Sequence, residues 1–136
     1  MIDFMQIALK EAKKSLRTDD VPVGAVIVEK GKIISKAHNT REKNNIVTKH
    51  AEINAIEKAC RKKKNWYLND CEIYITLEPC KMCMGAIEQS RIKKIYYATP
   101  REESSVIKVN KECNNIHSEE AKKMLKTFFK NKRKWY

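Results

Sequence analysis

The chain has 136 residues, of which 42% are hydrophobic and 34% are charged. A chain of this length is the size of one domain, so we expect a single domain over residues 1–136, and its apolar share excludes an intrinsically disordered protein. The formal net charge of +12 favours a polyanionic partner such as a nucleic acid, although a lysine-rich, well-solvated surface gives the same charge.

The first part of the chain predicts one helix followed by a hairpin. Residues 2–17 carry apolar side chains at helical spacing with lysines opposite, which is typical of an amphipathic helix. The apolar run 21–28 predicts a buried strand, and a second strand is expected at 33–38, after the turn signal Lys30-Gly31-Lys32. Residues 39–47 are polar and predict a loop.

Three more helices and three more strands are expected in the rest of the chain. The helices run from His50 to about Lys62, from Pro79 to about Gln89 and from Ser118 onward, and the strands cover Cys71–Leu77, Ile95–Ala98 and Val106–Val109. Ser118 is a typical helix cap, and the helix after it should turn Phe128 and Phe129 inward. The order of elements predicts an α/β fold, a three-layer α-β-α sandwich around a five-stranded mixed sheet.

The sequence also bears on the compartment. No apolar run approaches the roughly 20 residues that span a bilayer, and the N-terminus lacks the pattern of a secretory signal, so we expect a cytoplasmic protein with no membrane partner. The number of cysteines is odd, which does not suggest a disulfide framework. Only Cys80 and Cys83 are closely spaced, and we interpret Cys60, Cys71 and Cys113 as ordinary small apolar residues.

Two short motifs carry the chemistry. His50-Ala51-Glu52 opens one predicted helix, and Pro79-Cys80-Lys81-Met82-Cys83 opens the next, directly after a strand. One histidine and two cysteines are ligands that zinc prefers, and three protein ligands leave the fourth tetrahedral position for water, as in catalytic sites. Helix N-termini stabilise thiolates, and zinc lowers the pKa of its water to about 7, so Glu52 can take up the proton of that water.

Each motif alone is a weak signal, since Cys-x-x-Cys also occurs in thioredoxin-like redox sites. Together, in this order and with Pro79 before the first cysteine, they match the signature of zinc deaminases that act on nucleobases. The alternative is a zinc site that only stabilises the fold, although such a site usually has a fourth cysteine or histidine. His38 and His117 lie outside any ligand-like pattern, and we interpret both as bystanders.

At these motifs the chain resembles the cytidine deaminase superfamily and, more narrowly, the bacterial tRNA adenosine deaminases, which make inosine at the wobble position. The resemblance is close over residues 1–98 and returns at Phe128–Arg133. The segments that carry it are residues 21–28, 38–42, 50–56, 76–87 and 90–92.

The resemblance implies roles for individual residues. His50, Cys80 and Cys83 would bind one Zn²⁺, and Glu52 would be the catalytic proton shuttle. The residues implied to meet the base or its ribose are Val23, Asn39, Leu77, Glu78 and Pro79, and those implied to contact the anticodon loop are Phe129, Lys132 and Arg133. The resemblance also implies a homodimer.

Three features depart from the family pattern. Lys49 stands directly before the zinc histidine, where the family usually has a small residue, and Arg101 stands near the place of a usually acidic residue. The segment after Thr99 is also shortened. Because parallel strands need a crossover of about a dozen residues or more, we expect the strands Ile95–Ala98 and Val106–Val109 to form an antiparallel hairpin.

The leading functional hypothesis is hydrolytic deamination of adenosine to inosine in a tRNA anticodon loop. The shortened segment and Lys49 favour an alternative, a deaminase of a free base or nucleoside such as cytosine, guanine or cytidine. A third hypothesis is a non-catalytic RNA-binding module, which the intact Glu52 disfavours.

Overall fold

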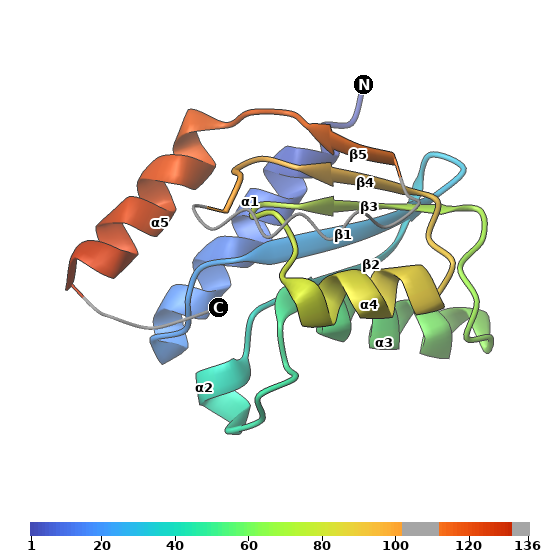
Figure 1. The fold of residues 1–136 in the computed structure, drawn as a ribbon, viewed down its shortest axis with the longest axis horizontal. Coiled ribbons are helices and arrows are strands. Elements are labelled where there is room, and N and C mark those ends of the chain that lie inside the picture. Colours follow the sequence, from blue (N-terminus) through green and yellow to red (C-terminus); the bar gives the residue numbers. More distant parts are fainter. Residues whose placement is uncertain (102–111, 132–136) are drawn as a thin grey trace.

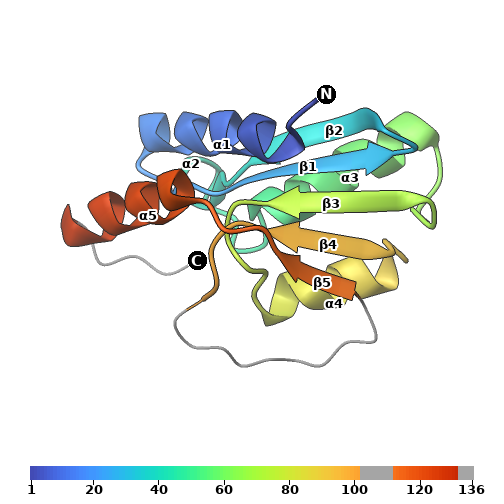
Figure 2. The same ribbon diagram turned by 90° about the horizontal axis from the view of Figure 1, so that it is seen from above.

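A five-stranded sheet with the order β2-β1-β3-β4-β5 forms the middle layer of the protein, whose computed structural model describes residues 1–101 and 112–131. The strands are β1 (Gly24–Glu29), β2 (Lys32–His38), β3 (Cys71–Ile75), β4 (Lys94–Tyr97) and β5 (Glu112–Asn115). The helices are α1 (Phe4–Ser15), α2 (Arg41–Asn44), α3 (Ala51–Lys63), α4 (Lys81–Gln89) and α5 (Glu119–Asn131), with a 3-10 turn η1 (Leu16–Thr18) after α1. Helices α3 and α4 lie side by side on one face of the sheet, and α1 covers the other (Figures 1 and 2). The predicted three-layer α/β sandwich with a mixed sheet is confirmed.

Side chains of the central strand β1 alternate between two apolar cores, because successive residues of a strand point to opposite faces. Ala25 and Ile27 belong to the core that also contains residues of α3 and α4, whereas Val26 and Val28 pack with α1. All four side chains are buried, which explains why this strand reads as a continuous apolar run. Packing against this face of the sheet thereby holds α3 and α4, the two helices that carry the metal-ligand motifs, in place.

The predicted hairpin of the first two strands is confirmed, although β1 begins later than expected. β1 and β2 pair antiparallel, with Gly24 opposite His38. The buried residues before Gly24 lie outside the strand, because Pro22 has no N–H to donate to a sheet. The backbone N–H of Asn39 instead donates to the carbonyl of Val23. The predicted loop at residues 39–47 contains one helical turn, α2.

The predicted antiparallel hairpin of the last two strands is wrong. β5 pairs with β4 in parallel, with Lys94 opposite Glu112 and Tyr97 opposite Asn115. The predicted strand Val106–Val109 lies outside the described residues. The hairpin was expected because the connection from Thr99 to residue 106 is short, but residues 98–111 join β4 to β5 and reach the length that a parallel crossover needs.

The last helix, α5, agrees with its predicted start but not with its predicted inner face. Ser118 caps it, since its Oγ accepts from the backbone N–H of Ala121 at 3.2 Å. Leu125 and Phe128 are buried, whereas Phe129 is 38% exposed, because it lies beyond the stripe that meets the core. Within residues 1–101 and 112–131, no helix combines the length and hydrophobicity needed to cross a bilayer.

Replacing Gly24 by alanine is expected to destabilise the fold strongly. A Cβ at this position would lie 2.0 Å from the carbonyl oxygen of Ala8 and 2.6 Å from the backbone N of Ala12, so α1 would have to move away from β1. Overpacking of this kind costs about 1–3 kcal/mol or more, and a rigid backbone neighbour puts the change at the upper end. Urea unfolding measures the loss.

The matched control for this substitution is Gly85→Ala in α4. Among the residues that the structure describes, none outside the backbone of this helix comes within 4 Å of a Cβ built at Gly85, so alanine meets no obstacle there. Alanine in a helix interior is favoured over glycine by about 0.5–1 kcal/mol, so this variant should be at least as stable as the wild type. Equal stability of the Gly24→Ala variant and the wild type would contradict the close packing of α1 on β1.

Candidate metal centre

Two helix N-termini carry the predicted metal ligands. His50 is the N-cap residue of α3 and Cys80 is the N-cap residue of α4, both with extended backbone, and Cys83 lies in the first turn of α4. Because α3 and α4 run side by side from one end of the sheet, their first turns meet (Figure 1). Helix N-termini carry partial positive charge, which favours thiolate over thiol.

The three side chains converge on one point. His50 Nδ1 lies 3.4 Å from Cys83 Sγ and 3.7 Å from Cys80 Sγ, and one ligand atom from each residue lies within 4.8 Å of the others. Zn–N and Zn–S bonds of about 2.0–2.1 and 2.3 Å at a tetrahedral angle separate nitrogen from sulfur by about 3.6 Å. The donor set and its spacing therefore fit one Zn²⁺, and the three residues are positioned to bind it.

A hydrogen bond between the two cysteines shifts their pKa values in opposite directions. Donation from the Cys83 thiol lowers the pKa of Cys80 to about 3. The same hydrogen bond, together with burial and the nearby Glu52 carboxylate, raises the pKa of Cys83. Binding of a dication would remove the proton of the Cys83 thiol, because metal ligation requires both sulfurs as thiolates.

Glu52 lies two residues after His50, in the first turn of α3, and is fully buried. Its charge acts on Cys83, which places the carboxylate beside the metal ligands. A buried carboxylate next to an open metal position is suited to moving protons between a water and a substrate. The histidines outside this group have other partners: the Nδ1 of His38 lies 3.2 Å from Ser15 Oγ, and His117 lies 2.6 Å from Glu119.

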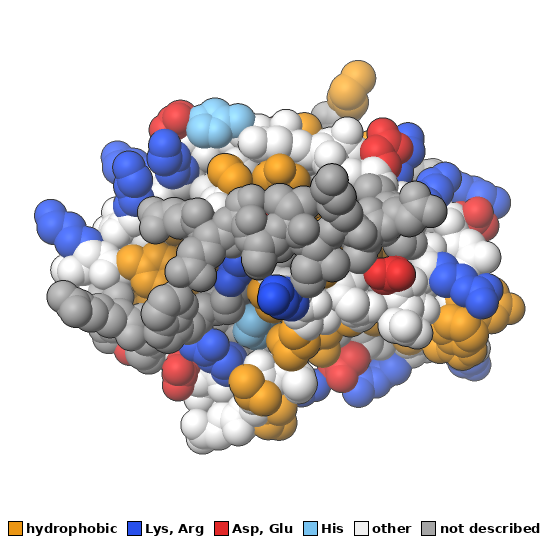
Figure 3. Space-filling model, viewed as in Figure 1, with side chains coloured by type: hydrophobic (Ala, Val, Ile, Leu, Met, Phe, Trp, Pro, Cys, Tyr) orange, Lys and Arg blue, Asp and Glu red, His pale blue; other side chains and the backbone are white. Residues whose placement is uncertain are grey.

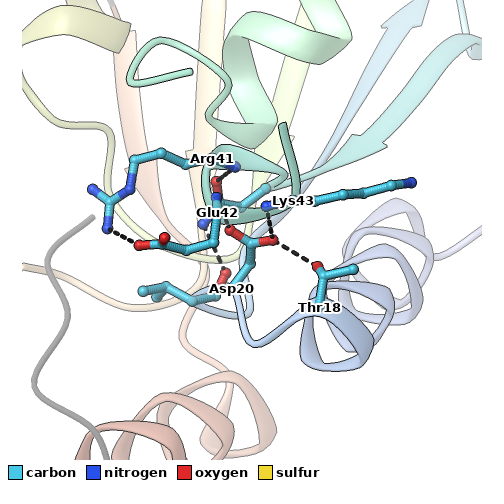
Figure 4. Close-up of polar contacts among 7 residues, drawn as sticks. Thr18, Asp20, Arg41, Glu42 and Lys43 are labelled. Carbon is cyan, nitrogen blue, oxygen red and sulfur yellow. Dashed lines mark hydrogen bonds and ion pairs between the residues drawn. The ribbon is translucent and has the colours of Figure 1, made fainter. Parts of the chain in front are cut away.

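The loop between β2 and α3, which leads directly into His50, is held by a buried carboxylate from elsewhere in the chain. The Asp20 carboxylate accepts from the backbone N–H groups of Glu42 and Lys43 at 2.5 and 3.2 Å, and from the Thr18 hydroxyl at 2.6 Å (Figure 4). Asp20 is fully buried and binds the first turn of α2 as a capping residue does. No local signal in the sequence indicates this role, because the contact joins residues 22 apart.

Asn54, whose role the sequence did not predict either, holds the same loop from the α3 side. It lies one turn after His50, and its Nδ2 donates to the carbonyl of His38, the hydroxyl of Thr40 and the carbonyl of Lys49 at 2.9–3.3 Å. Its place just after the His-x-Glu motif is the only hint in the sequence, and a polar residue there suits an exposed helix surface equally well. The loop is therefore tied both to the start of β1 and to α3.

Five residues predicted to meet the substrate lie at the ends of β1, β2 and β3 on the side of the sheet where the metal-ligand helices begin. Val23 precedes β1, Asn39 follows β2, and the remaining three connect β3 to α4. Of the five, Glu78 is partly exposed and the others are buried: Val23, Asn39, Leu77 and Pro79. The Asn39 amide donates to the carbonyl of Val21 and accepts from the N–H of Arg41, which uses part of its hydrogen-bonding capacity.

The two residues that depart from the family pattern have partners in the structure. Lys49 Nζ lies 2.6 Å from Glu57 Oε1 on the outer side of α3, in a half-exposed ion pair. The backbone N–H of Arg101 donates to Glu78 Oε1 at 3.0 Å, and its guanidinium lies 3.4 Å from the Glu78 carbonyl. Arg101 therefore contacts the segment that leads into the metal motif.

The residues predicted to contact the anticodon loop are only partly described. Phe129 is on α5, with its ring 5.6 Å from that of Phe128 in an edge-on contact. Lys132 and Arg133 lie outside the described residues. The structure thus brings together the metal ligands, Glu52 and the edge of the sheet, and it leaves the predicted RNA contacts at the end of α5 as predictions.

Comparison with known proteins gives one family match and several similar chains. The model of the cytidine and deoxycytidylate deaminase zinc-binding region matches residues 1–99. The tRNA-specific adenosine deaminase of Aquifex aeolicus strain VF5 is 42% identical over 142 aligned positions, covering 96% of this chain and 94% of the relative.

Two solved structures are also similar to this chain. One comes from a study of A-to-I editing by tRNA:A34 deaminases at the wobble position of transfer RNA; it has a TM-score of 0.76 and 33% identity, and the match covers 82% of this chain and 95% of the other. The other is guanine deaminase from Bacillus subtilis, with a TM-score of 0.68 and 39% identity, covering 71% of this chain and 62% of the other.

Proposed function

Because this chain belongs to the cytidine and deoxycytidylate deaminase family, we propose that it is a zinc-dependent hydrolase that converts adenosine to inosine at the wobble position of tRNA. The main support for a tRNA substrate is the 42% identity with a tRNA-specific adenosine deaminase over nearly the whole length of both chains. The structure from the study of tRNA:A34 deaminases supports the same substrate. The net charge of +12 suits a polyanion.

The reaction replaces the exocyclic amine of adenine by oxygen from water and releases ammonia. Zinc held by His50, Cys80 and Cys83 would supply a Lewis acid that activates the water. Glu52 would accept a proton from that water and donate it to the ring nitrogen next to the reacting carbon, while the water oxygen adds to that carbon. Glu52 would then take the remaining proton of the added hydroxyl and pass it to the amine, which leaves as ammonia as the C=O bond forms. Burial of Glu52 keeps bulk water from competing for these protons.

In this proposal, the residues at the strand ends next to the metal centre form the pocket for the base. Leu77, Glu78 and Pro79 lead from β3 into Cys80, and their backbone would meet the edge of the base. Val23 lies on the neighbouring strand segment, and Asn39 bonds to it through the backbone. The Asn39 amide keeps one N–H and one lone pair for the base or its ribose.

Further parts of the proposal concern partners and compartment. Phe129, Lys132 and Arg133 would contact the anticodon loop, since aromatic and basic side chains bind unstacked bases and phosphates. We propose a homodimer, as the family resemblance implies. We also propose a cytoplasmic location, which fits five cysteines that form no disulfide, as expected in a reducing compartment.

The proposal is tested with the zinc-loaded protein and a tRNA that has adenosine at the wobble position. Inosine is read as guanosine on sequencing of the copied RNA, so conversion of the wobble adenosine alone is the expected result. The same tRNA with guanosine at that position is the control. No inosine with any tRNA, from protein with a full complement of zinc, would reject the tRNA substrate.

A second candidate function is deamination of a free base or nucleoside. The observation that favours it is the 39% identity with guanine deaminase from Bacillus subtilis. Ammonia release from guanine, cytosine, cytidine and adenosine, measured beside the tRNA assay, separates the two functions. Turnover of a free base faster than that of tRNA would select this candidate.

A further inference from the structure

The ends of α3 and α4 that point away from the metal centre carry two basic residues in an unusual backbone conformation. Lys64 has φ +55° and Arg91 has φ +64°, and each lies where its helix stops. Glycine is the usual residue at such left-handed helix ends, because a side chain crowds the backbone there. The left-handed conformation is itself common at helix ends, so the notable feature is that a cation stands at both positions instead of glycine.

Two exposed aromatic rings lie beside these residues. Trp66 is 58% exposed and Tyr67 is 43% exposed, and their rings meet edge-on with centroids 5.2 Å apart. The guanidinium of Arg91 lies over the Trp66 ring, 5.2 Å from its centroid. This cation–π contact holds the indole in one orientation, and its large exposed area remains available to a ligand.

The surroundings of these rings are strongly basic. Arg61, Lys62 and Lys93 are also exposed, and each lies within three residues of Lys64 or Arg91 in the chain; the exposed acidic residues in the same two segments are Asp70 and Glu88. Figure 3 shows blue side chains gathered around orange ones at the right-hand end of the molecule, where Figure 1 places the ends of α3 and α4. Cores of protein interfaces are depleted in lysine, whereas exposed aromatic rings among cations are typical of sites that bind single-stranded nucleic acid.

We propose that this surface, made of Arg61, Lys62, Lys64, Trp66, Tyr67 and Arg91, is a second RNA-binding site that stacks an unpaired nucleotide on Trp66 and binds its phosphates through the cations. The inference rests on the proposed RNA substrate. Helix α3 has 13 residues, which at 1.5 Å per residue puts this Trp66 surface about 20 Å from His50. It therefore binds a part of the RNA other than the nucleotide that reacts.

The test uses the zinc-loaded full-length protein with the double substitution Lys64→Gly and Arg91→Gly. Glycine relieves the left-handed backbone, so the melting temperature should stay equal or rise. Affinity for tRNA should fall on the order of tenfold, and the slope of log Kd against log salt should shrink by about 0.7 for each single-strand phosphate that the variant no longer neutralises. KM for tRNA should rise while kcat at saturating tRNA stays unchanged.

Lys30→Gly is the matched control, because Lys30 is also an exposed lysine with a positive φ, +50°, but lies on the β1–β2 turn. It should gain stability with less than about a twofold change in tRNA affinity, as expected for one exposed charge. Trp66→Ala should weaken tRNA binding at least about fivefold, and Trp66→Phe should recover most of that loss, because phenylalanine keeps a ring for stacking.

Three results decide the matter. Unchanged tRNA affinity in both the double glycine variant and Trp66→Ala, with wobble deamination intact in the wild type, would overturn the second site and leave the proposed function standing. A change of oligomeric state in these variants, measured by sedimentation, would assign the surface to contacts between copies of the chain and would also overturn it. RNA binding that depends on Trp66, in a protein that deaminates no tRNA, would support the surface and reject the proposed substrate.

Discussion

Cys83→Ala is expected to abolish both zinc binding and deaminase activity. Cys83 is fully buried, and its Sγ lies 3.4 Å from His50 Nδ1. Its loss leaves two protein ligands, whereas a catalytic tetrahedral zinc site needs three protein ligands beside the water. Purified variant should contain less than about a tenth of a zinc ion per chain, and activity should fall below detection. Because metal binding stabilises the folded state only, the melting temperature should also fall. Metal analysis and thermal unfolding measure these changes.

Cys113→Ala is the matched control for this prediction. Cys113 is an exposed free thiol on β5, away from the group that can share a metal ion. Its replacement should leave the zinc content and the melting temperature of the protein unchanged. A full complement of zinc in the Cys83→Ala protein would mean that another residue completes the site, and the assignment of Cys83 as a ligand would be withdrawn.

The chemistry of the metal centre was predictable because its sequence signal is local. Cys80 and Cys83 are three residues apart at the start of a helix, so their sulfurs fall within one turn whatever the rest of the fold does. Glu52 lies two residues after His50 in the first turn of α3, so the closeness of these two residues is also fixed by the local sequence. That His50 meets Cys80, 30 residues away, depends on the packing of α3 beside α4, and the resemblance to the family supplied this expectation.

The last strand, β5, shows where hydrophobic pattern fails. It is Glu112–Asn115, a polar and largely exposed segment that the sequence did not mark as a strand, whereas the predicted strand Val106–Val109 lies outside the described residues. A strand at the edge of a sheet gains its stability from backbone hydrogen bonds on one side and need not be apolar, so periodicity does not mark it. β5 is parallel to β4, and the connection from the end of β4 to Glu112 is long enough for a parallel crossover.

Long-range polar contacts were equally invisible in the sequence. Asp20 carries no local signal in the sequence, yet its carboxylate binds the first turn of α2 and thereby the loop that leads to His50. Lys49 stood out in the sequence only because it precedes His50, and the structure pairs its ammonium with Glu57 on α3. Which groups a buried or half-buried side chain meets is decided by tertiary packing, which a single sequence does not encode locally.

Glu52→Gln is expected to remove catalysis while leaving the metal centre and the fold intact. Glutamine has nearly the same shape as glutamate but cannot accept and pass on a proton, so kcat should fall by about 10²–10⁴. Zinc content should be unchanged, because His50, Cys80 and Cys83 supply the ligands. The melting temperature should stay equal or rise, since a neutral amide replaces a fully buried carboxylate. KM for tRNA should change little, because the substitution alters the chemical step.

Glu57→Gln on the same helix serves as the control, since Glu57 is partly exposed and pairs with Lys49 at the surface, where ion pairs contribute about 0–1 kcal/mol. Its kcat and KM should both lie close to the wild-type values. A Glu52→Gln protein with full zinc and near-wild-type kcat would show that another group carries the protons. Loss of zinc in that variant would instead make Glu52 part of the metal site. The predicted combination, inactive yet zinc-loaded and RNA-binding, also separates an enzyme from a non-catalytic RNA-binding module, because only an enzyme depends on this carboxylate.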